Sequence, residues 1–372
     1  MSQRTAPPFR ADHVGSLLRP ARLTEARGEH AAGRLTSEEL GAVEDDAIRE
    51  VVRLQEEAGL RSATDGEFRR TTWHMDFIDS LGGITHAEER ITVRFHNDDG
   101  TIEWNPTAMR VSGRVTLEQP IFADHFSFLQ SCVTTATSKL TIPSPSMLHY
   151  RGGRASIAED VYPDLEEFWS DVTTAYAAEV RALGEIGCTY LQFDDTSLAY
   201  LNDPAQREFV TKMSGDPEHL HEDYIRHIND ALAGRTDGMS VTAHLCRGNF
   251  QSSWVAQGGY DYVAEALFND LGVDGLFLEY DDARSGGFEP LRFVPPGKVV
   301  VLGLVTTKRG DLESKDDLKR RIEEASQYVD VDQLCLSGQC GFSSTVEGNA
   351  LTHDEQWAKV RLIVETAEEV WG

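Results

Sequence analysis

Residues Ser240–Asn249 read SVTAHLCRGN, and residues Gly275–Asp282 read GLFLEYDD. Each stretch is a short apolar run that ends in polar or charged residues, which is typical of a buried strand running into a loop. Between them lies the amphipathic run Tyr260–Leu271, followed by Gly272, a residue type that commonly ends helices. The predicted strands are Ser240–Leu245 and Gly275–Glu279. With the helix between them, they predict a parallel βαβ unit with a right-handed crossover.

The same alternation continues along the chain. Other candidate strands are Phe9–Val14, Ser62–Asp65, Met109–Val115, Lys139–Pro143, Tyr190–Phe193, Val299–Val305 and Gln333–Ser337. Other candidate helices are Ser37–Ala58, Leu165–Ile186, Pro217–Ala233, Lys315–Val329 and Thr352–Val370. This repetition predicts an α/β fold, a (β/α)8 TIM-type barrel in which residues 1–372 form one domain. An open doubly wound sheet is the alternative, but no strand is followed by the glycine-rich GxGxxG turn that often accompanies it.

Two segments do not fit the simple alternation. The nine candidate strands exceed the eight of a closed barrel, so we expect Met109–Val115 to lie outside it. The segment His86–Pro106 is rich in charged and turn-forming residues and predicts a β-hairpin excursion around Asp99 and Gly100. We do not expect this excursion to be a separate domain.

Composition excludes several classes of function. The chain has 62 acidic and 35 basic residues, a net charge of -27, which disfavours nucleic acid and anionic membranes as partners. No apolar run approaches the length of a membrane span, and the N-terminal residues lack the apolar core of a signal peptide, so a cytoplasmic protein is expected. The odd number of cysteines, five, favours free or metal-bound thiols over disulfides.

The ends of three predicted strands carry residues that suit a metal ion. His244 and Cys246 are two residues apart, so an extended strand places both side chains on one face. Glu279 follows an apolar run, where a carboxylate is costly unless it is paired or bound to metal. Cys340 follows a later strand, in a glycine-rich loop. One imidazole, two thiolates and one carboxylate suit tetrahedral Zn²⁺, although a core histidine beside a buried thiol is the alternative for His244 and Cys246.

Such a ligand set favours thiol chemistry. Two thiolates place much negative charge on zinc, which makes it poorly suited to activating water and better suited to holding an external thiol as a nucleophilic thiolate. We therefore expect alkyl transfer to sulfur, with Glu279 as the ligand that loosens when the thiol enters. Cys335 alternates with Leu334 and Leu336 and is predicted to lie in the core.

Several motifs together resemble a known family. HLCRGN, FLEYDD and SGQCGFSS, with DHVGSLLRP near the N-terminus, ATDGEF and LQFDD, are similar to the catalytic domain of cobalamin-independent methionine synthase, and most of all to its single-domain bacterial relatives. The resemblance extends from Phe9 to the C-terminus. It implies a (β/α)8 barrel with a zinc cofactor bound by His244, Cys246, Glu279 and Cys340. It also implies that homocysteine is recognised through its amino-acid group by Ser16, Glu67 and Asp194.

This resemblance implies roles that make physical sense. Carboxylates at Glu67 and Asp194 suit the ammonium group of homocysteine, and the backbone and hydroxyl of Gly15-Ser16 suit its carboxylate. One of the two neighbouring aspartates, Asp194 or Asp195, is alternatively the cap of a following helix. No catalytic proton donor is assigned.

The chain departs from the family where the methyl donor binds. It lacks the second, N-terminal barrel of full-length methionine synthases, and the stretch 144–150 has no tryptophan to stack on a pterin. A histidine that the family uses as proton donor is replaced around Thr306-Thr307. We therefore expect methyl transfer to homocysteine, giving methionine, from a donor other or simpler than polyglutamyl methyltetrahydrofolate. Trp73, His74 and His149 are candidate donor contacts, with ordinary packing as the favoured interpretation.

Two other functions stay open. A zinc-dependent transferase of the epoxyalkane:coenzyme M type would act on a sulfonate thiol, and arginines 19, 69, 70 and 247 lie next to the site motifs. A zinc-binding or regulatory protein without turnover is the third interpretation. The expected partners are a small thiol and an unidentified methyl donor, with a homodimer as one expected assembly.

Overall fold

The computed structural model describes residues 4–97, 100–213 and 215–372. Its α-helices are α1 (Ala21–Ala31), α2 (Ser37–Glu57), α3 (Met75–Ile78), α4 (Ala123–Cys132), α5 (Leu165–Glu185), α6 (Ser197–Tyr200), α7 (Pro204–Lys212), α8 (Leu220–Ala231), α9 (Ala264–Asp270), α10 (Lys315–Ala325) and α11 (His353–Trp371). Its strands are β1 (Ser62–Ala63), β2 (Gly82–Arg90), β3 (Val93–Asn97), β4 (Gly100–Trp104), β5 (Thr107–Thr116), β6 (Thr137–Ser138), β7 (Leu140–Pro143), β8 (Tyr190–Asp195), β9 (Ser240–Leu245), β10 (Gly275–Glu279), β11 (Val299–Val305) and β12 (Leu334–Gly338).

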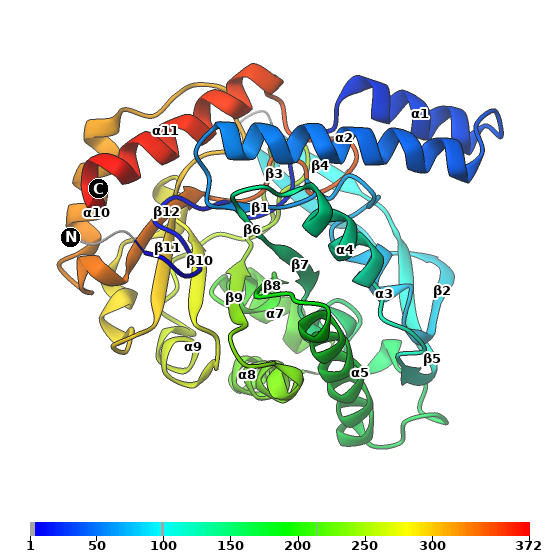
Figure 1. The fold of residues 1–372 in the computed structure, drawn as a ribbon. Helices are drawn as coiled ribbons and strands as arrows, with labels where there is room; N and C mark the ends of the chain where they lie inside the picture. Colours follow the sequence, from blue (N-terminus) through cyan, green and yellow to red (C-terminus); the bar gives the residue numbers. More distant parts are fainter. Residues whose placement is uncertain (1–3, 98–99, 214) are drawn as a thin grey trace.

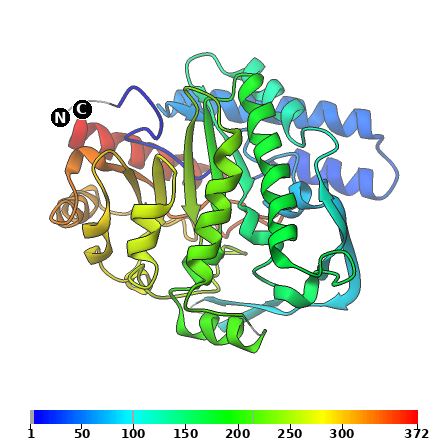
Figure 2. The same ribbon diagram turned by 90° about the horizontal axis from the view of Figure 1, so that it is seen from below.

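Parallel strands form the centre of the molecule. Six of them make one sheet in the order β12-β11-β10-β9-β8-β7, and β1 pairs with β6 in a separate parallel pair. Figure 1 shows the strands in the middle, with α2 and α11 on one side and α8, α9 and α5 on the opposite side. Figure 2, seen from below, shows α5 and α8 running alongside each other over the strands. This is an α/β fold with parallel sheets, similar to a TIM barrel.

The sheet interior explains the apolar runs in the sequence. Every residue of β10, β11 and β12 is buried, as expected for parallel strands covered on both faces. The largest core cluster fills the space between the sheet and its helices, and a second cluster lies beneath α1, α2 and α11. The capping box predicted at Thr352 is present, with Glu355 reaching back to the backbone of Thr352. Among the residues described, no helix has the length and apolarity needed to cross a membrane.

The predicted strand Phe9–Val14 is wrong as a regular strand. Its one backbone bridge joins Ala11 to Leu336 of β12. The cause is Asp12, whose buried carboxylate accepts hydrogen bonds from the backbone N–H groups of Phe9 at 3.0 Å and His13 at 2.8 Å. These N–H groups therefore do not form a ladder with a neighbouring strand.

Both irregular segments behave as predicted. Met109–Val115 lies within β5, which pairs antiparallel with β2 outside the parallel sheets. β3 and β4 form the hairpin expected within His86–Pro106. Its predicted turn residue Asp99 lies outside the described residues. The hairpin is fixed to the body of the protein by an antiparallel bridge between His96 and Trp254.

A buried ion pair joins the N-terminal segment to the central strands. Lys139, between β6 and β7, has no exposed surface, and its Nζ lies 3.3 Å from Oδ1 of the equally buried Asp12. Asp12 also accepts hydrogen bonds from Ser62 at 2.9 Å and Tyr190 at 2.8 Å. Burial alone would raise the pKa of Asp12, but Lys139 and the hydrogen bonds hold it below its usual value. The carboxylate is therefore charged, and it links four parts of the chain.

We predict that Lys139→Met lowers the free energy of unfolding by about 3–5 kcal/mol, because it leaves Asp12 charged and unpaired in the interior. Urea denaturation at pH 7 measures the change. Lys212→Met, at an exposed lysine of α7, is the control and should change stability by less than about 0.5 kcal/mol. A loss below about 1 kcal/mol for Lys139→Met would contradict the role given to this pair.

Candidate metal centre

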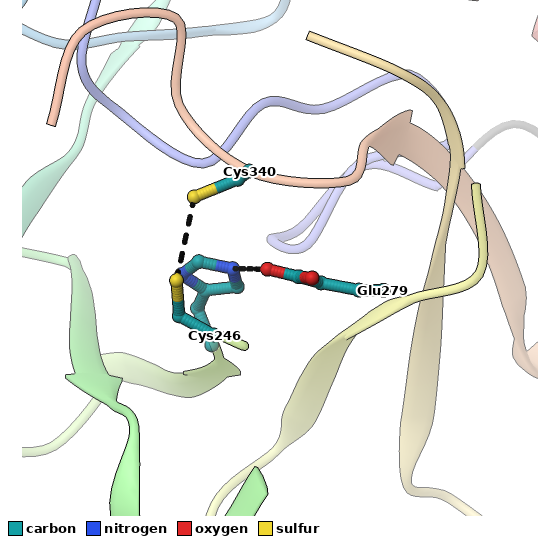
Figure 3. A group of neighbouring side chains, drawn as sticks. Cys246, Glu279 and Cys340 are labelled. Carbon is teal, nitrogen blue, oxygen red and sulfur yellow. Dashed lines mark hydrogen bonds and ion pairs between the residues drawn. The ribbon is translucent and has the colours of Figure 1, made fainter. Parts of the chain in front are cut away.

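Four side chains meet at the carboxyl ends of the central strands. The parallel register places the end of β9 beside β10, so His244 and Cys246 arrive next to Glu279. Cys340 comes from the loop after β12. One ligand atom from each residue lies within 4.8 Å of all the others, and all four residues are buried. Figure 3 shows Cys246, Glu279 and Cys340 pointing toward a common point from three different segments.

The spacing of these atoms fits a tetrahedral metal ion. The two sulfur atoms are 3.5 Å apart, and Nε2 of His244 is 3.9 Å from Oε1 of Glu279. Two thiolates bound to one zinc at ~2.3 Å each lie about 3.8 Å apart, so little movement is needed. Nε2 of His244 and Oε2 of Glu279 are buried and have no hydrogen-bond partner. Buried polar atoms without partners are costly, and a bound metal would satisfy both.

The second side of the imidazole is held by a carboxylate. Nδ1 of His244 lies 3.2 Å from Oδ1 of Asp194, which holds a proton on Nδ1 and turns Nε2 toward the cluster. Asp194 is itself held by Nε2 of Gln192 at 2.7 Å. Burial lowers the pKa of His244, but Asp194 and Cys340 outweigh it and raise this pKa to about 10.

The pKa values of the two thiols are shifted in opposite directions. A hydrogen bond from Cys246, and then the contact with His244, lower the pKa of Cys340 well below its usual value. The same hydrogen bond, with burial, raises the pKa of Cys246. A bound cation would replace the thiol proton that this pair shares.

The cluster opens into a pocket of about 630 Å³ that also contains Ser16, Glu67 and Asp194. The structure therefore brings all three predicted substrate residues to the predicted metal ligands. Asp195, the neighbour of Asp194, points elsewhere and accepts a hydrogen bond from the backbone of Leu198 at 2.7 Å, as a helix cap does. Of the two adjacent aspartates, Asp195 therefore makes the capping contact, and Asp194 lines the pocket.

Close backbone contacts shape the end of this pocket at Ser16. Gly15 has φ +146°, and a Cβ there would lie 2.8 Å from Cγ2 of Thr141. A Cβ on Gly341 would lie 2.0 Å from Oγ of Ser16, so glycine is required for the loop after β12 to reach Ser16.

Glu67 combines three unfavourable features. Its φ is +61°, a left-handed conformation that is strained for a residue other than glycine. Its carboxylate is buried, with Oε1 held by the Thr141 hydroxyl at 3.0 Å and Oε2 without a partner. Burial, opposed in part by Arg70, raises the pKa of Glu67 to about 7. A buried carboxylate with one free oxygen suits a cationic ligand group.

Several pocket residues were not predicted as part of the site. Phe95, Trp104, Arg151, Tyr200 and Phe250 line it. Trp73 and His74, for which ordinary packing was the favoured interpretation, line it as well. Phe95 and Trp104 come from the β3–β4 hairpin. The alternation of apolar and polar residues within His86–Pro106 was the sequence pattern that could have indicated an inward-facing side of this hairpin. His149 does not line this pocket, because its Nδ1 is hydrogen-bonded to the Tyr224 hydroxyl at 2.8 Å.

A second cavity, of about 970 Å³, adjoins the first along the β2–β5 hairpin. It shares His74, Trp104 and Arg151 with the metal pocket. Its remaining wall is largely apolar and includes Met75, Ile78, Ile91, Met109 and Met147.

The fold and the site define an α/β protein with parallel sheets, similar to a TIM barrel, with a candidate metal centre at the carboxyl edge of its parallel strands. Residues 9–369 match the family model described as "Cobalamin-independent synthase, Catalytic domain", and the chain belongs to this family.

Relatives match over nearly the full chain. The uncharacterized protein YxjG of Bacillus subtilis is 48% identical over 371 residues, covering 99% of this chain and 96% of its own. A solved structure from Listeria monocytogenes, a candidate vitamin-B12 independent methionine synthase, is 36% identical with a TM-score of 0.78, covering 99% of this chain and 100% of that chain. A B12-independent methionine synthase from Shewanella sp. W3-18-1, solved with selenomethionine, shares the fold with a TM-score of 0.72 at 21% identity, covering 97% of each chain.

We predict that Glu67→Gln stabilises the protein at pH 8 by about 1–3 kcal/mol, because it removes a charge that burial disfavours. The folded-state pKa of about 7 lies above the usual 4.5, so the cost of this charge is full above pH 7 and fades as the pH falls toward 4.5. Urea denaturation at pH 8 and pH 5 should show a smaller gain at pH 5. The exposed Glu159→Gln is the control, and a Glu67→Gln variant that loses stability at pH 8 would contradict the prediction.

Proposed function

We propose that this chain is a zinc-dependent S-methyltransferase that transfers a methyl group to homocysteine and gives methionine. The observation that carries the proposal is the His244, Cys246, Glu279 and Cys340 cluster, which opens into the pocket of Glu67, Asp194 and Ser16. Membership of the synthase family supports it, as does the name of the Shewanella relative. We further propose that the segment Phe9–Val14, β1, the consecutive β6 and β7 taken as one strand, and β8 to β12 close into a (β/α)8 barrel, and that residues 1–372 are one domain.

Zinc, when bound to the four residues, would hold the thiol of the substrate as a reactive thiolate. The residues of the chain supply the rest. Asp194 orients His244 through Nδ1, and its carboxylate, with that of Glu67, receives the ammonium group of homocysteine. Ser16 and the neighbouring backbone receive the carboxylate. Because Glu67 has a pKa of about 7, the ammonium group replaces its proton near neutral pH.

The coenzyme M alternative requires a cation for a sulfonate, and the four arginines considered for this role are used elsewhere. Arg19 donates to the backbone oxygens of Glu67 and Arg70, both at 2.9 Å. Arg70 donates to the backbone oxygen of Thr141 at 2.7 Å, and Arg247 to that of Glu279 at 2.8 Å. Arg69 donates to the carboxylate of Asp45 at 2.5 Å. These contacts favour an amino-acid thiol as the substrate.

Zinc-edge X-ray absorption with and without L-homocysteine tests the substrate. We expect about one zinc per chain, bound by two sulfurs, and a third sulfur when homocysteine is added but not when coenzyme M is added. Glu67→Gln should keep the metal and weaken the response to homocysteine. A new sulfur ligand from coenzyme M alone would move the assignment to the alternative, and a metal-reconstituted protein without zinc would end the proposal.

Cysteine variants test the metal ligands separately. Cys340→Ala should lower zinc affinity roughly tenfold or more, because it removes one of the four ligands and leaves Cys246 without the sulfur beside it. Metal content after dialysis against a weak chelator measures this. Cys132→Ala, at a half-buried free cysteine outside the site, is the control and should retain zinc. Equal zinc content in both variants would remove Cys340 from the ligand set.

A further inference from the structure

The wall of the metal pocket is unusually aromatic. Five rings line it, those of Trp73, Phe95, Trp104, Tyr200 and Phe250. Three of them are joined through Phe250, whose ring centre lies 5.2 Å from that of Phe95 and 6.2 Å from that of Trp104. The amino-acid group of homocysteine is already provided for by carboxylates and a hydroxyl. The rings are therefore available to the second substrate, the methyl donor.

One cation faces the same space. Arg151 lines both the pocket and the adjoining cavity, and its guanidinium lies 5.8 Å from the ring centre of Trp104. Within the described ranges, no carboxylate forms an ion pair with Arg151. In a chain with a net charge of -27, an arginine without an acidic partner inside a pocket indicates a place for an anionic group of a ligand.

The metal end of the pocket has the opposite charge. Two thiolates and Glu279 carry three negative charges, one more than a divalent cation supplies, and the entering thiolate would add another. Glu67 and Asp194 lie in the same pocket. The methyl-bearing atom of the donor is therefore best placed there if it is positively charged, with any anionic part directed to Arg151.

We propose that the methyl donor is a small onium carboxylate, a methylsulfonium or quaternary methylammonium compound. Its cationic head is held by the rings of Trp73, Phe95, Trp104, Tyr200 and Phe250, and its carboxylate by Arg151. Aromatic rings bind such cations through their electron-rich faces. This inference rests on the proposed function, because it concerns the second substrate of the same site.

The reaction balances without a proton donor at the leaving group. The thiolate sulfur forms a bond to the methyl carbon, the carbon–onium bond breaks, and its electron pair neutralises the departing sulfur or nitrogen. The thiol proton is released to solvent when the thiolate forms. This agrees with the residues present. Burial lowers the pKa of His74, so its imidazole is neutral. The Thr307 hydroxyl donates within the protein, to Oε1 of Gln339 and to the backbone oxygen of Gly341, both at 3.0 Å.

The adjoining cavity accommodates donors of different length. Because it meets the metal pocket at His74, Trp104 and Arg151, the part of a donor beyond its carboxylate has space along the β2–β5 hairpin. The apolar and methionine side chains there suit an uncharged body.

A pair of matched ligands tests recognition without turnover. Glycine betaine and 3,3-dimethylbutanoate have the same shape and carboxylate, but only betaine carries the positive charge. Calorimetric titration of the zinc-loaded protein should give at least tenfold tighter binding of betaine. Trp104→Ala should reduce this preference, and Arg151→Gln should weaken both ligands. Tyr262→Ala and Arg94→Gln, at exposed positions outside the pocket, should change neither.

Methyl transfer completes the test. Betaine, dimethylsulfoniopropionate or S-methylmethionine should yield methionine from homocysteine. In Trp104→Ala and Arg151→Gln, the rate of methyl transfer should fall in proportion to the loss of donor binding. Equal binding of the two matched ligands, binding of neither, or transfer from methylcobalamin or 5-methyltetrahydrofolate alone would overturn the proposal. X-ray absorption measures separately whether zinc gains a sulfur ligand when homocysteine is added. The assignment of the thiol substrate is therefore tested independently of the methyl donor.

Discussion

The buried carboxylate of Asp12 is the interaction on which the site geometry depends. It accepts hydrogen bonds from backbone N–H groups of its own segment, and it also contacts Lys139, Ser62 of β1 and Tyr190 of β8. Because a single backbone bridge, to Leu336 of β12, joins this segment to the sheet, side-chain contacts supply the rest of its attachment. Four residues later the same segment presents Ser16 to the pocket. Ion pairs buried this deeply add little net stability, so positional definition is the better explanation of this one.

The site concentrates features that a protein selected only for stability would avoid. Glu67 has a strained backbone and a buried charge, and the cluster around His244 leaves polar atoms without partners. Each of these costs free energy. A bound cation would relieve the buried charge and the unpartnered atoms, whereas the backbone strain remains. The surrounding strands, buried on both faces, supply the stability that tolerates them.

Much of this could be predicted from the sequence, because two local patterns are strong. Buried parallel strands read as apolar runs, and the bounds of β9, β10 and β11 follow directly from them. Polar residues at the ends of such runs meet at one edge, which explains why the four candidate ligands were found. The Phe9–Val14 prediction failed because a side chain replaced the expected ladder. Arg151 and the ring of Tyr200 were missed because only folding brings them to the pocket.

The β3–β4 hairpin separates part of the pocket wall from the elements that carry the candidate metal ligands. Phe95 and Trp104 lie on an excursion joined to the body by the bridge between His96 and Trp254, whereas the candidate metal ligands belong to the central strands and the loops that follow them. Sequence changes in the hairpin can therefore alter the wall of the pocket while the metal centre stays unchanged. Descendants of one ancestral enzyme could in this way exchange one co-substrate for another, and a designer could do the same by grafting hairpins.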